Sequence, residues 1–587
     1  MWILRVNMAD RTYHLDGVPE AYKNLGGRGL TSTIVHDEVP PLCHPLGPNN
    51  KLVFAPGIVT GTVAPTSSRI SVGAKSPLTG GIKESNAGSS WAQYLAVLDI
   101  KALVVEGQPK EKGKYWMIHL TWDADAGKPK VEFLPADEYT GKNLYDVFPK
   151  VYERFGAKAA IAGIGVAGEY GYGSAGIVFN DMAKRPSRYS GRGGLGAVMG
   201  SKGLKFIVAE RAGAPGVTVA DKALFDQGRK KLTDAIRTHD LTKPKGALNT
   251  YGTAVLINII NEAGGLPTRN FADGRFEGAA KIAGEAIFEA NKERTGKELY
   301  NHACSPGCII QCSNTYHKPD GSEHTSCVEY ESDWALGANC DIDDLDDIAE
   351  LVHLCNAYGI DTIEAGTTLA VAMEGGVIPF GDGKKAIGLL HEMGKGTPLG
   401  RILGGGTELA AKTYGVTRVP VVKGQSMPAY EPRAIKGIGV TYATSTMGAD
   451  HTSGYTIAPE IAGVGGSADA LAPEGKADLS RGFQTATAFI DTSGHCLFIA
   501  FAILDIASGF EGMVEECNGV LGTSWTTDDV GKIGAGILRK ERAFNEAAGF
   551  TKAHDRLPEF MEYEPLPPHN QVFDVSDDEL DSVYGKL

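Results

Sequence analysis

The chain has 587 residues, 76 of them glycine, and a formal net charge of −14 at pH 7. This length excludes one compact core, since domains usually have about 100 to 200 residues, and two to four domains are expected. The excess of Asp and Glu argues against a nucleic-acid partner, because neutralising phosphates requires a surplus of Lys and Arg.

The sequence predicts neither a signal peptide nor a membrane-spanning helix. Residues 1–15 mix charges with a few apolar side chains and lack the apolar core of a signal peptide. The most apolar stretch, residues 488–508, contains Asp491, His495 and Asp505, which a bilayer-spanning helix would bury in lipid. We therefore expect a cytoplasmic protein without membrane association, in which this stretch forms buried core or the wall of a site.

The N-terminal third is expected to be β-rich. Short apolar runs at residues 51–55, 102–105 and 204–208 are separated by Gly, Pro and Ser turns, which is typical of strands. From about residue 221 the pattern changes to helical periodicity, most clearly at residues 343–358. Further helices are expected at residues 386–393 and 405–414.

These patterns predict an α+β protein with three domains. Residues 1–210 would form a β-rich domain, and residues 211–420 and 421–587 two mainly helical domains, with the last boundary placed just after Pro420. No tandem repeat of about 20 to 50 residues is evident.

Two hexapeptides within the chain show a weak sequence similarity to each other. The first runs from Asn356 to Asp361 and the second from Asp491 to Cys496. Both have glycine in fourth place and end on a residue that can act as a ligand.

Three cysteines carry the strongest chemical signal. Cys304, Cys308 and Cys312 are four residues apart, and Pro306 opposes a regular helix between them. The odd number of nine cysteines and the absence of a signal peptide disfavour disulfides. Iron–sulfur clusters normally take four cysteine thiolates, so a fourth is needed from elsewhere, and Cys496 is the candidate.

Two other interpretations of these cysteines are weaker. A zinc site would need a second pair of Cys or His, which is not evident, and His302 is too close in sequence to substitute. The spacing also fits radical S-adenosylmethionine enzymes poorly. Three buried structural cysteines are the remaining alternative.

Two glycine-rich segments could bind a polyanion. Residues 187–202 contain Arg188 and Arg192, and residues 64–88 contain Arg69, hydroxyl groups and Asn86. Arginine forks bind phosphate, and glycines let backbone N–H groups approach it closely. Turn-rich loops that pack two sheets would have the same composition, and a Walker A motif is absent.

Together these segments resemble the aldehyde:ferredoxin oxidoreductase family of tungstoenzymes over nearly the whole chain. The resemblance is carried in order by Thr-Ser-Ser-Arg69, Lys75–Gly80, Asn86, the phrase at residues 191–202, the three cysteines, Glu329-Tyr330-Glu331 and both hexapeptides. Two departures stand out: the first cysteine gap is often one residue shorter in the family, and Asn356 replaces the usual Asp.

The resemblance implies a tungsten or molybdenum ion held by two pterins, Mg²⁺ bridging their phosphates, and a [4Fe-4S] cluster on Cys304, Cys308, Cys312 and Cys496. The β-rich domain would cradle the pterins. Their contacts by motif match would be Arg69, Asn86, Gly88, Arg188, Gly191, Arg192, Asn356, Asp361, Asp491 and Gly494.

The implied reaction is the oxidation of aldehydes to carboxylic acids. Glu331 would be the base and His451 would hydrogen-bond the substrate carbonyl, with Tyr330 as a further catalytic residue and Glu329 as the main risk of misassignment. Electrons would leave through the cluster to ferredoxin, or to iron–sulfur and flavin subunits that feed NAD. A homo- or hetero-oligomer is compatible with this.

A further family phrase, Glu350-Leu-Val-His353, is linked to a metal between subunits. On a helix, Glu350 and His353 would share a face, and His391 could complete the site. An ordinary exposed pair is the alternative.

Two other functions remain open at this point. The ring-reducing benzoyl-CoA reductase subunit resembles this family in fold and cofactor. A non-catalytic electron-transfer subunit would keep only the iron–sulfur cluster.

Overall fold

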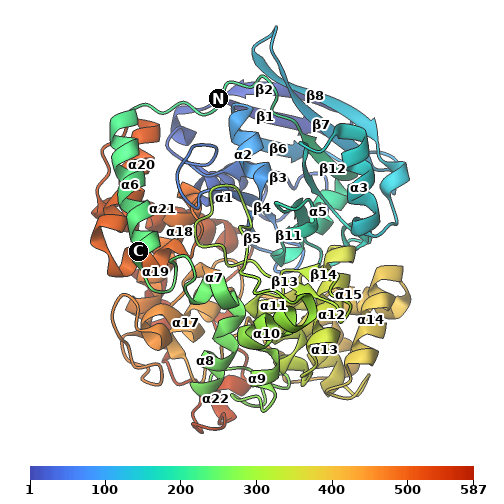
Figure 1. Cartoon of the computed structure of the whole chain (residues 1–587), viewed down its shortest axis with the longest axis vertical. Coiled ribbons are helices and arrows are strands. Elements are labelled where there is room, and N and C mark those ends of the chain that lie inside the picture. The colour runs from blue at the N-terminus through green and yellow to red at the C-terminus, as the bar shows by residue number, and fades with distance from the viewer.

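Two β-sheets lie at the top of the computed structural model, and helices form the bottom and the left of the view in Figure 1. The structure describes all residues, 1–587. No helix in it combines the length and the apolar character needed to cross a membrane.

Both sheets have six strands in the same spatial order. The first has the order β2-β1-β6-β3-β4-β5 and the second the order β8-β7-β12-β9-β10-β11. In each, one parallel pair (β1 with β6, β7 with β12) sits among antiparallel pairs. The strands are β1 (Trp2–Asn7), β2 (Thr12–Gly17), β3 (Leu52–Pro56), β4 (Arg69–Lys75), β5 (Ile82–Gly88), β6 (Ile100–Glu106), β7 (Trp116–Asp123), β8 (Lys128–Pro135), β9 (Ala160–Gly163), β10 (Ile177–Asn180), β11 (Pro186–Ser190) and β12 (Leu204–Ala209).

The chain therefore builds the same unit twice, and helices occupy equivalent places in both copies. Those helices are α1 (Gly27–Glu38) and α2 (Ser90–Val97) in the first copy, and α3 (Leu144–Phe155) and α5 (Leu195–Ser201) in the second, with the short α4 (Val166–Glu169) besides. Strands β3 and β12 are buried along their whole length. Their mostly apolar sequences reflect burial on both faces, although β12 also buries Lys205, and the three expected strands are confirmed.

The rest of the chain is mainly helical, as expected. The helices are α6 (Lys222–Thr238), α7 (Ala247–Tyr251), α8 (Leu256–Glu262), α9 (Ala279–Ile282), α10 (Gly284–Thr295), α11 (Tyr330–Leu336), α12 (Leu345–Tyr358), α13 (Thr362–Glu374), α14 (Gly383–Lys395), α15 (Pro398–Gly404), α16 (Thr407–Tyr414), α17 (Lys436–Thr444), α18 (Lys476–Ser493), α19 (Ile499–Asp505), α20 (Ala507–Leu521), α21 (Thr527–Ala547), α22 (Phe560–Tyr563) and α23 (Asp577–Gly585). Two small hairpins, β13 (Thr315–His317) with β14 (Glu323–Ser326) and β15 (Val421–Val422) with β16 (Gln425–Ser426), interrupt them. The division of this part at residue 421 stays a prediction.

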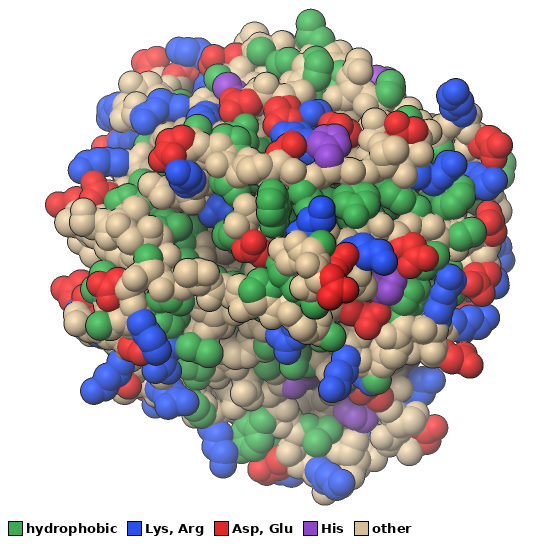
Figure 2. Space-filling model, turned by 90° about the horizontal axis from the view of Figure 1, so that it is seen from above, with side chains coloured by type: hydrophobic (Ala, Val, Ile, Leu, Met, Phe, Trp, Pro, Cys, Tyr) green, Lys and Arg blue, Asp and Glu red, His purple; other side chains and the backbone are tan.

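Separate hydrophobic cores underlie the sheets and the helices. One core contains residues of the strands and of α2, α3 and α5, and a larger one extends mainly through the helical part. Phe544 of α21 packs into a third, small core with α1 and the first sheet, so the end of the chain returns to its beginning. On the face seen in Figure 2, basic and acidic side chains are interspersed.

Candidate active site

A large cleft opens where the two sheets meet the helices. It contains about 1370 Å³ of space not filled by protein atoms, part of it open to solvent. Pockets for drug-sized ligands enclose roughly 300–1000 Å³, and the comparable volume of this cleft, about 330 Å³, falls in that range. The predicted residues that line it are Arg69, Asn86, Gly88, Arg188, Gly191, Arg192, Glu331, Asn356, Asp361, His451 and Asp491.

Each of the two hexapeptides docks on one sheet. Gly359 and Gly494 end α12 and α18 with φ of 79° and 93°, a left-handed conformation that favours glycine. The Gly359 carbonyl accepts a hydrogen bond from the Gly176 N–H (3.0 Å), and the Gly494 carbonyl accepts one from the Arg69 N–H (3.2 Å). The weak similarity between the two hexapeptides thus corresponds to equivalent hydrogen bonds with the two sheets. Gly494 itself does not line the cleft.

Several buried polar atoms in the cleft have no partner within the chain. They include Nε of Arg69, Nε of Arg188 and Oδ1 of Asn86. Buried polar atoms are nearly always hydrogen-bonded, so an orphaned set facing one cleft indicates a ligand. Guanidinium groups beside an amide fit a phosphate-bearing heterocycle, and the residues present therefore fit a bis-pterin cofactor.

The four predicted cluster cysteines lie together beside the cleft. Thr66 joins them, because its carbonyl accepts from the Cys496 N–H (2.9 Å) and its N–H donates to the Gly307 carbonyl (2.9 Å). A Cβ on Gly88 would lie 2.9 Å from both Cys304 Sγ and Arg69 Nη1. Glycine at this position therefore lets the thiols, the arginine and the cleft wall approach one another.

The four thiols differ in their electrostatic environment. No group of three or more His, Cys, Asp or Glu side chains converges closely enough to hold one metal ion. A hydrogen bond from Cys308, and then the charges of Arg188 and Arg69, hold the pKa of Cys304 well below its usual value. At Cys304 this favours thiolate, the form that binds iron. The pKa of Cys308 is raised by its hydrogen bond with Cys304, and burial raises the pKa values of Cys312 and Cys496.

Glu331 and His451 meet at the wall of the cleft. Glu331 Oε1 lies 3.5 Å from His451 Nδ1, and Glu331 Oε2 accepts a hydrogen bond from the Ala429 N–H (3.0 Å). Burial raises the pKa of Glu331 to about 8 and lowers the pKa of His451 to about 4. Near neutral pH the imidazole is therefore neutral, and the carboxyl group titrates in the working range of an acid–base catalyst.

An ion pair between Lys83 and Asp450 lies beside His451 at the wall of the cleft. Lys83, which is buried, donates to Asp450 Oδ2 over 3.1 Å, and Asp450 Oδ1 lies 3.8 Å from His451 Nδ1. Although burial opposes ionisation, Lys83 and Arg192 hold the pKa of Asp450 far below its usual range. The sequence interpretation did not single out Lys83 or Asp450.

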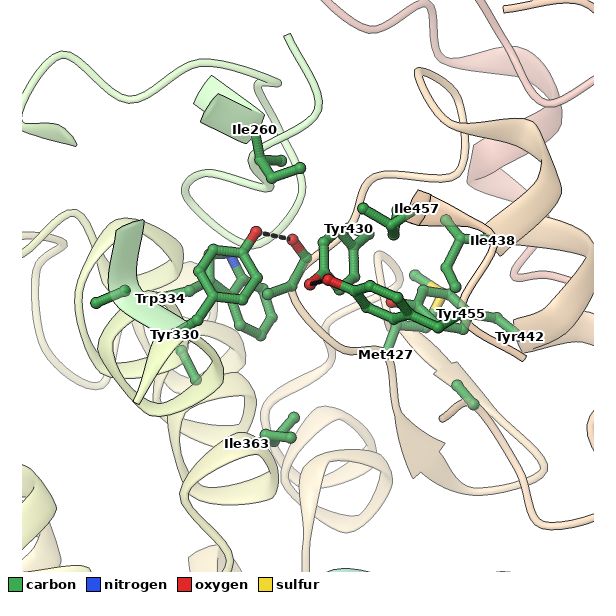
Figure 3. Packing of buried hydrophobic residues seen from close by; sticks show 14 of the residues in the cluster. Ile260, Tyr330, Trp334, Ile363, Met427, Tyr430, Ile438, Tyr442, Tyr455 and Ile457 are labelled. Carbon is green, nitrogen blue, oxygen red and sulfur yellow. Dashed lines mark hydrogen bonds between the residues drawn. The ribbon is translucent and has the colours of Figure 1, made fainter. Parts of the chain in front are cut away.

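Tyr330 does not line the cleft. Its hydroxyl donates to the Ala429 carbonyl (2.7 Å) and its ring lies 5.3 Å from that of Tyr430. Figure 3 shows Tyr330 and Trp334 facing a group that contains Tyr430, Tyr442 and Tyr455. In this structure Tyr330 thus packs behind Glu331 and orders the loop at Ala429, which binds Glu331 in turn.

An apolar cavity adjoins the cleft. It contains about 990 Å³ of empty space and is lined mainly by hydrophobic side chains of α18, α19 and α20. Leu497 lines both the cavity and the cleft. Tyr455 also lines the cavity, and its ring centroid lies 6.5 Å from that of His451. The cavity therefore begins next to the Glu331–His451 pair.

Glu350 and His353 line neither the cleft nor the apolar cavity. Glu350 Oε2 contacts His324 Nε2 at 2.7 Å, whereas the His353 ring stacks on Tyr145 at 4.3 Å. His391 bonds the Tyr358 hydroxyl instead. Within one copy of the chain these side chains do not form a group that could hold a metal, and a metal shared between subunits stays a prediction.

Among the cleft residues missed from the sequence, Arg28 has the clearest signal. It stands in Gly26-Gly-Arg-Gly29, a phrase of the same kind as Gly191-Arg-Gly-Gly194. Glu84, Cys327 and Leu497 also line the cleft. No motif distinguishes these three from ordinary core residues.

Comparisons with known proteins agree along the whole chain. Residues 3–211 match the model of the aldehyde ferredoxin oxidoreductase N-terminal domain, and residues 227–586 that of domains 2 and 3 of the same family. The tungsten-containing aldehyde ferredoxin oxidoreductase of Pyrococcus abyssi is 37% identical over 96% of this chain and 92% of its own. The one from Thermococcus kodakarensis is 38% identical over 96% and 91%.

Two more distant relatives have other activities in their names. An aliphatic sulfonate oxidoreductase, WOR-like subunit, of Pyrococcus furiosus is 27% identical over 93% of this chain and 86% of its own. The active-site complex of benzoyl coenzyme A reductase with 1,5-dienoyl-CoA has a TM-score of 0.78, with 19% identity over 100% of this chain and 93% of that one. At this identity the likeness shows the fold alone.

Proposed function

The chain belongs to the aldehyde ferredoxin oxidoreductase family, and from this premise we propose that it oxidises aldehydes to carboxylic acids at a tungsten–pterin centre in the cleft. The observation that carries the proposal is the Glu331–His451 pair, which faces the same cleft as the orphaned polar atoms of Arg69, Asn86 and Arg188. Acid–base groups and a cofactor cradle therefore share one space.

The place of these residues in and beside the cleft supports an assignment of the cofactor contacts. Arg69, Asn86 and Arg188 would bind the pterins, Mg²⁺ would neutralise part of the phosphate charge, and the hexapeptides would close over the cofactor. Cys304, Cys308, Cys312 and Cys496 would hold a [4Fe-4S] cluster. When bound, the tungsten–pterin centre would accept the two electrons of the oxidation, and the cluster would pass them on singly.

The protein side chains manage the substrate and the proton. Neutral His451 can donate a ring N–H to the aldehyde oxygen, where negative charge develops. The oxidation takes one oxygen from water and releases two protons together with the two electrons, and ionised Glu331 can accept one of these protons. The Ala429 N–H and the Tyr330 ring behind it keep Glu331 turned toward His451.

The apolar cavity favours aldehydes with a hydrocarbon or aromatic substituent. Phe483, Phe498 and Phe501 contribute to its lining, and Asp478 is the one charged side chain there. Burying an apolar substituent contributes roughly 25 cal/mol per Å² of its surface. We expect kcat/KM to be higher for benzaldehyde or hexanal than for acetaldehyde or a carboxylated aldehyde.

Electrons would leave to ferredoxin or to iron–sulfur and flavin subunits, since the chain offers only one set of cluster thiols. The proposal places the enzyme in the cytoplasm, because all nine cysteines are free and thiols persist in a reducing compartment. A homo- or hetero-oligomer is compatible with it.

The decisive test uses anaerobically purified protein. Metal and pterin analysis should find tungsten or molybdenum with pterin and iron, and aldehydes should reduce a viologen dye. Protein that holds zinc at the thiols, or neither heavy metal nor pterin, would refute the proposal. Activity with benzoyl-CoA but not with benzaldehyde would favour ring reduction instead.

A further inference from the structure

Arg28 is buried to 2% exposure yet lines the cofactor cleft. Its fork pairs with Glu541 of α21 through Nε and Nη2, both at 2.9 Å. Its remaining nitrogen, Nη1, lies 3.4 Å from Asp491 Oδ2. A single guanidinium group thus joins the first helix of the chain, the long C-terminal helix α21 and the second hexapeptide.

The surroundings leave Arg28 little freedom to move. Glu541 accepts two further hydrogen bonds, from Ser32 Oγ (2.7 Å) and Thr446 Oγ1 (2.6 Å). At Gly27 a Cβ would collide with the Asp491 carbonyl oxygen, so glycine lets the start of α1 press against the hexapeptide. The fork is therefore fixed by Glu541, and its free edge is aimed at Asp491.

The other sheet offers a direct comparison. Helix α3 follows the β7–β8 hairpin as α1 follows the β1–β2 hairpin, and the second residue of α3 is Tyr145, where α1 has Arg28. Burial raises the pKa of Tyr145 to about 12, and the neighbouring Thr325 and Asn356 side chains lower it. Tyr145 thus lies beside Asn356, which opens the first hexapeptide as Asp491 opens the second.

The two halves of the cleft therefore differ in charge at equivalent positions. An ionic pair, Arg28 with Asp491, lines the half that adjoins the cysteines. In the other half the neutral Asn356 lines the cleft, and Tyr145 lies behind it with a buried hydroxyl that has no hydrogen-bond partner.

We infer that Arg28 is a positioning residue for the cofactor: clamped by Glu541, it holds the Asp491 carboxylate toward the pterin next to the cluster cysteines. This inference rests on the proposed function. A pterin presents N–H and amino donors, for which an ionised carboxylate is a strong acceptor. Without Arg28, Asp491 would be a buried, less compensated charge, which favours its protonation or its rotation away from the ligand.

The test compares tungsten and pterin per iron in purified variants. In Arg28→Gln we expect the tungsten-to-iron ratio to fall on the order of tenfold, as for other residues that orient a ligand, while iron per chain is kept. Arg433→Gln is the matched control, because Arg433 forms an equally buried fork with Glu431 outside the cleft. It should lower the thermal unfolding temperature but leave the ratio unchanged.

A double variant separates positioning from a general structural role. Because Arg28 acts through Asp491, the ratio in Arg28→Gln/Asp491→Asn should fall no further than in Asp491→Asn alone, whereas independent effects would multiply. If Arg28→Gln does not fold, Glu541→Gln, which loosens the fork, should still lower the ratio.

Three results would overturn the inference. The first is a wild-type tungsten-to-iron ratio in Arg28→Gln, or in Glu541→Gln where Arg28→Gln does not fold. The others are an equal fall of this ratio in Arg433→Gln and multiplicative effects in the double variant. If the wild-type protein itself carries no heavy metal or pterin, the proposed function fails first and takes the inference with it. A loaded wild type with an unaffected Arg28→Gln overturns the inference alone.

Discussion

His451 Nδ1 lies 3.5 Å from Glu331 Oε1, and neither atom has a hydrogen-bond partner. Two buried groups that face each other in this way are poised to exchange or share a proton with a third group placed between or beside them. The lowered pKa of His451 keeps the histidine neutral near pH 7, and the raised pKa of Glu331 places the glutamate near its titration point. Because the histidine stays neutral, the charge of ionised Glu331 is stabilised by the Ala429 N–H and by Arg192 instead.

The first prediction concerns pH. Since burial raises the pKa of Glu331 to about 8 and the base must be ionised, kcat should rise as the pH increases and level off above about 8. Below that value the slope should approach about tenfold per pH unit. Aldehyde-dependent viologen reduction between pH 6 and 9.5 measures it. A profile that is already flat from pH 6 would contradict the assignment.

Replacing the glutamate tests the same role by another route. Glu331→Gln should lower kcat by roughly 10²- to 10⁴-fold, because general-base catalysis is lost while the shape of the side chain is kept. Tungsten, pterin and iron contents should equal those of the wild type. Glu329→Gln serves as the comparison, since Glu329 bonds Thr253 (2.8 Å) rather than His451, and it should retain more activity. The reverse order would move the role to Glu329.

Much of the site could be predicted from the sequence because its ligands are chemically distinctive. Cys304, Cys308 and Cys312 stand at a spacing that few other structures use, and Gly359 and Gly494 each follow a helical segment in matching phrases. The family resemblance added Glu331 and His451, which no spacing would have distinguished. The change from strands to helices after residue 210 was visible because the two periodicities differ.

The remaining features depend on contacts between distant parts of the chain. Arg28 and Glu541 are 513 residues apart, so nothing near either residue indicates the pair. The doubling of the six-stranded unit is a property of strand order, which backbone hydrogen bonds determine and side chains need not repeat. The apolar cavity is enclosed by ordinary core residues such as Ile490 and Phe501, whose types are those of any packed interior.

His451 allows a graded prediction. His451→Ala should lower kcat by about 10²- to 10³-fold, the usual cost of losing one donor to a developing oxyanion. His451→Gln, whose amide can still donate a hydrogen bond, should lose less. Steady-state rates with one aldehyde at saturation give the comparison. Equal loss in both variants would show that donation from this position is not what the reaction uses.

The fourth cluster ligand gives the sharpest chemical prediction. Cys496 is brought to the cysteine loop by its backbone bond to Thr66, and Cys496→Ser should lower iron and acid-labile sulfide and slow viologen reduction. A serine hydroxyl is a poor substitute, since it stays protonated where a thiol ionises and binds iron. Cys327→Ser is the matched control: this thiol lines the same cleft but donates to the Ser187 carbonyl (2.8 Å), so iron should be unchanged. If only Cys327→Ser loses iron, Cys327 and not Cys496 is the fourth ligand. If both variants keep full iron, Cys496 is not a ligand and only three of the proposed ligands remain.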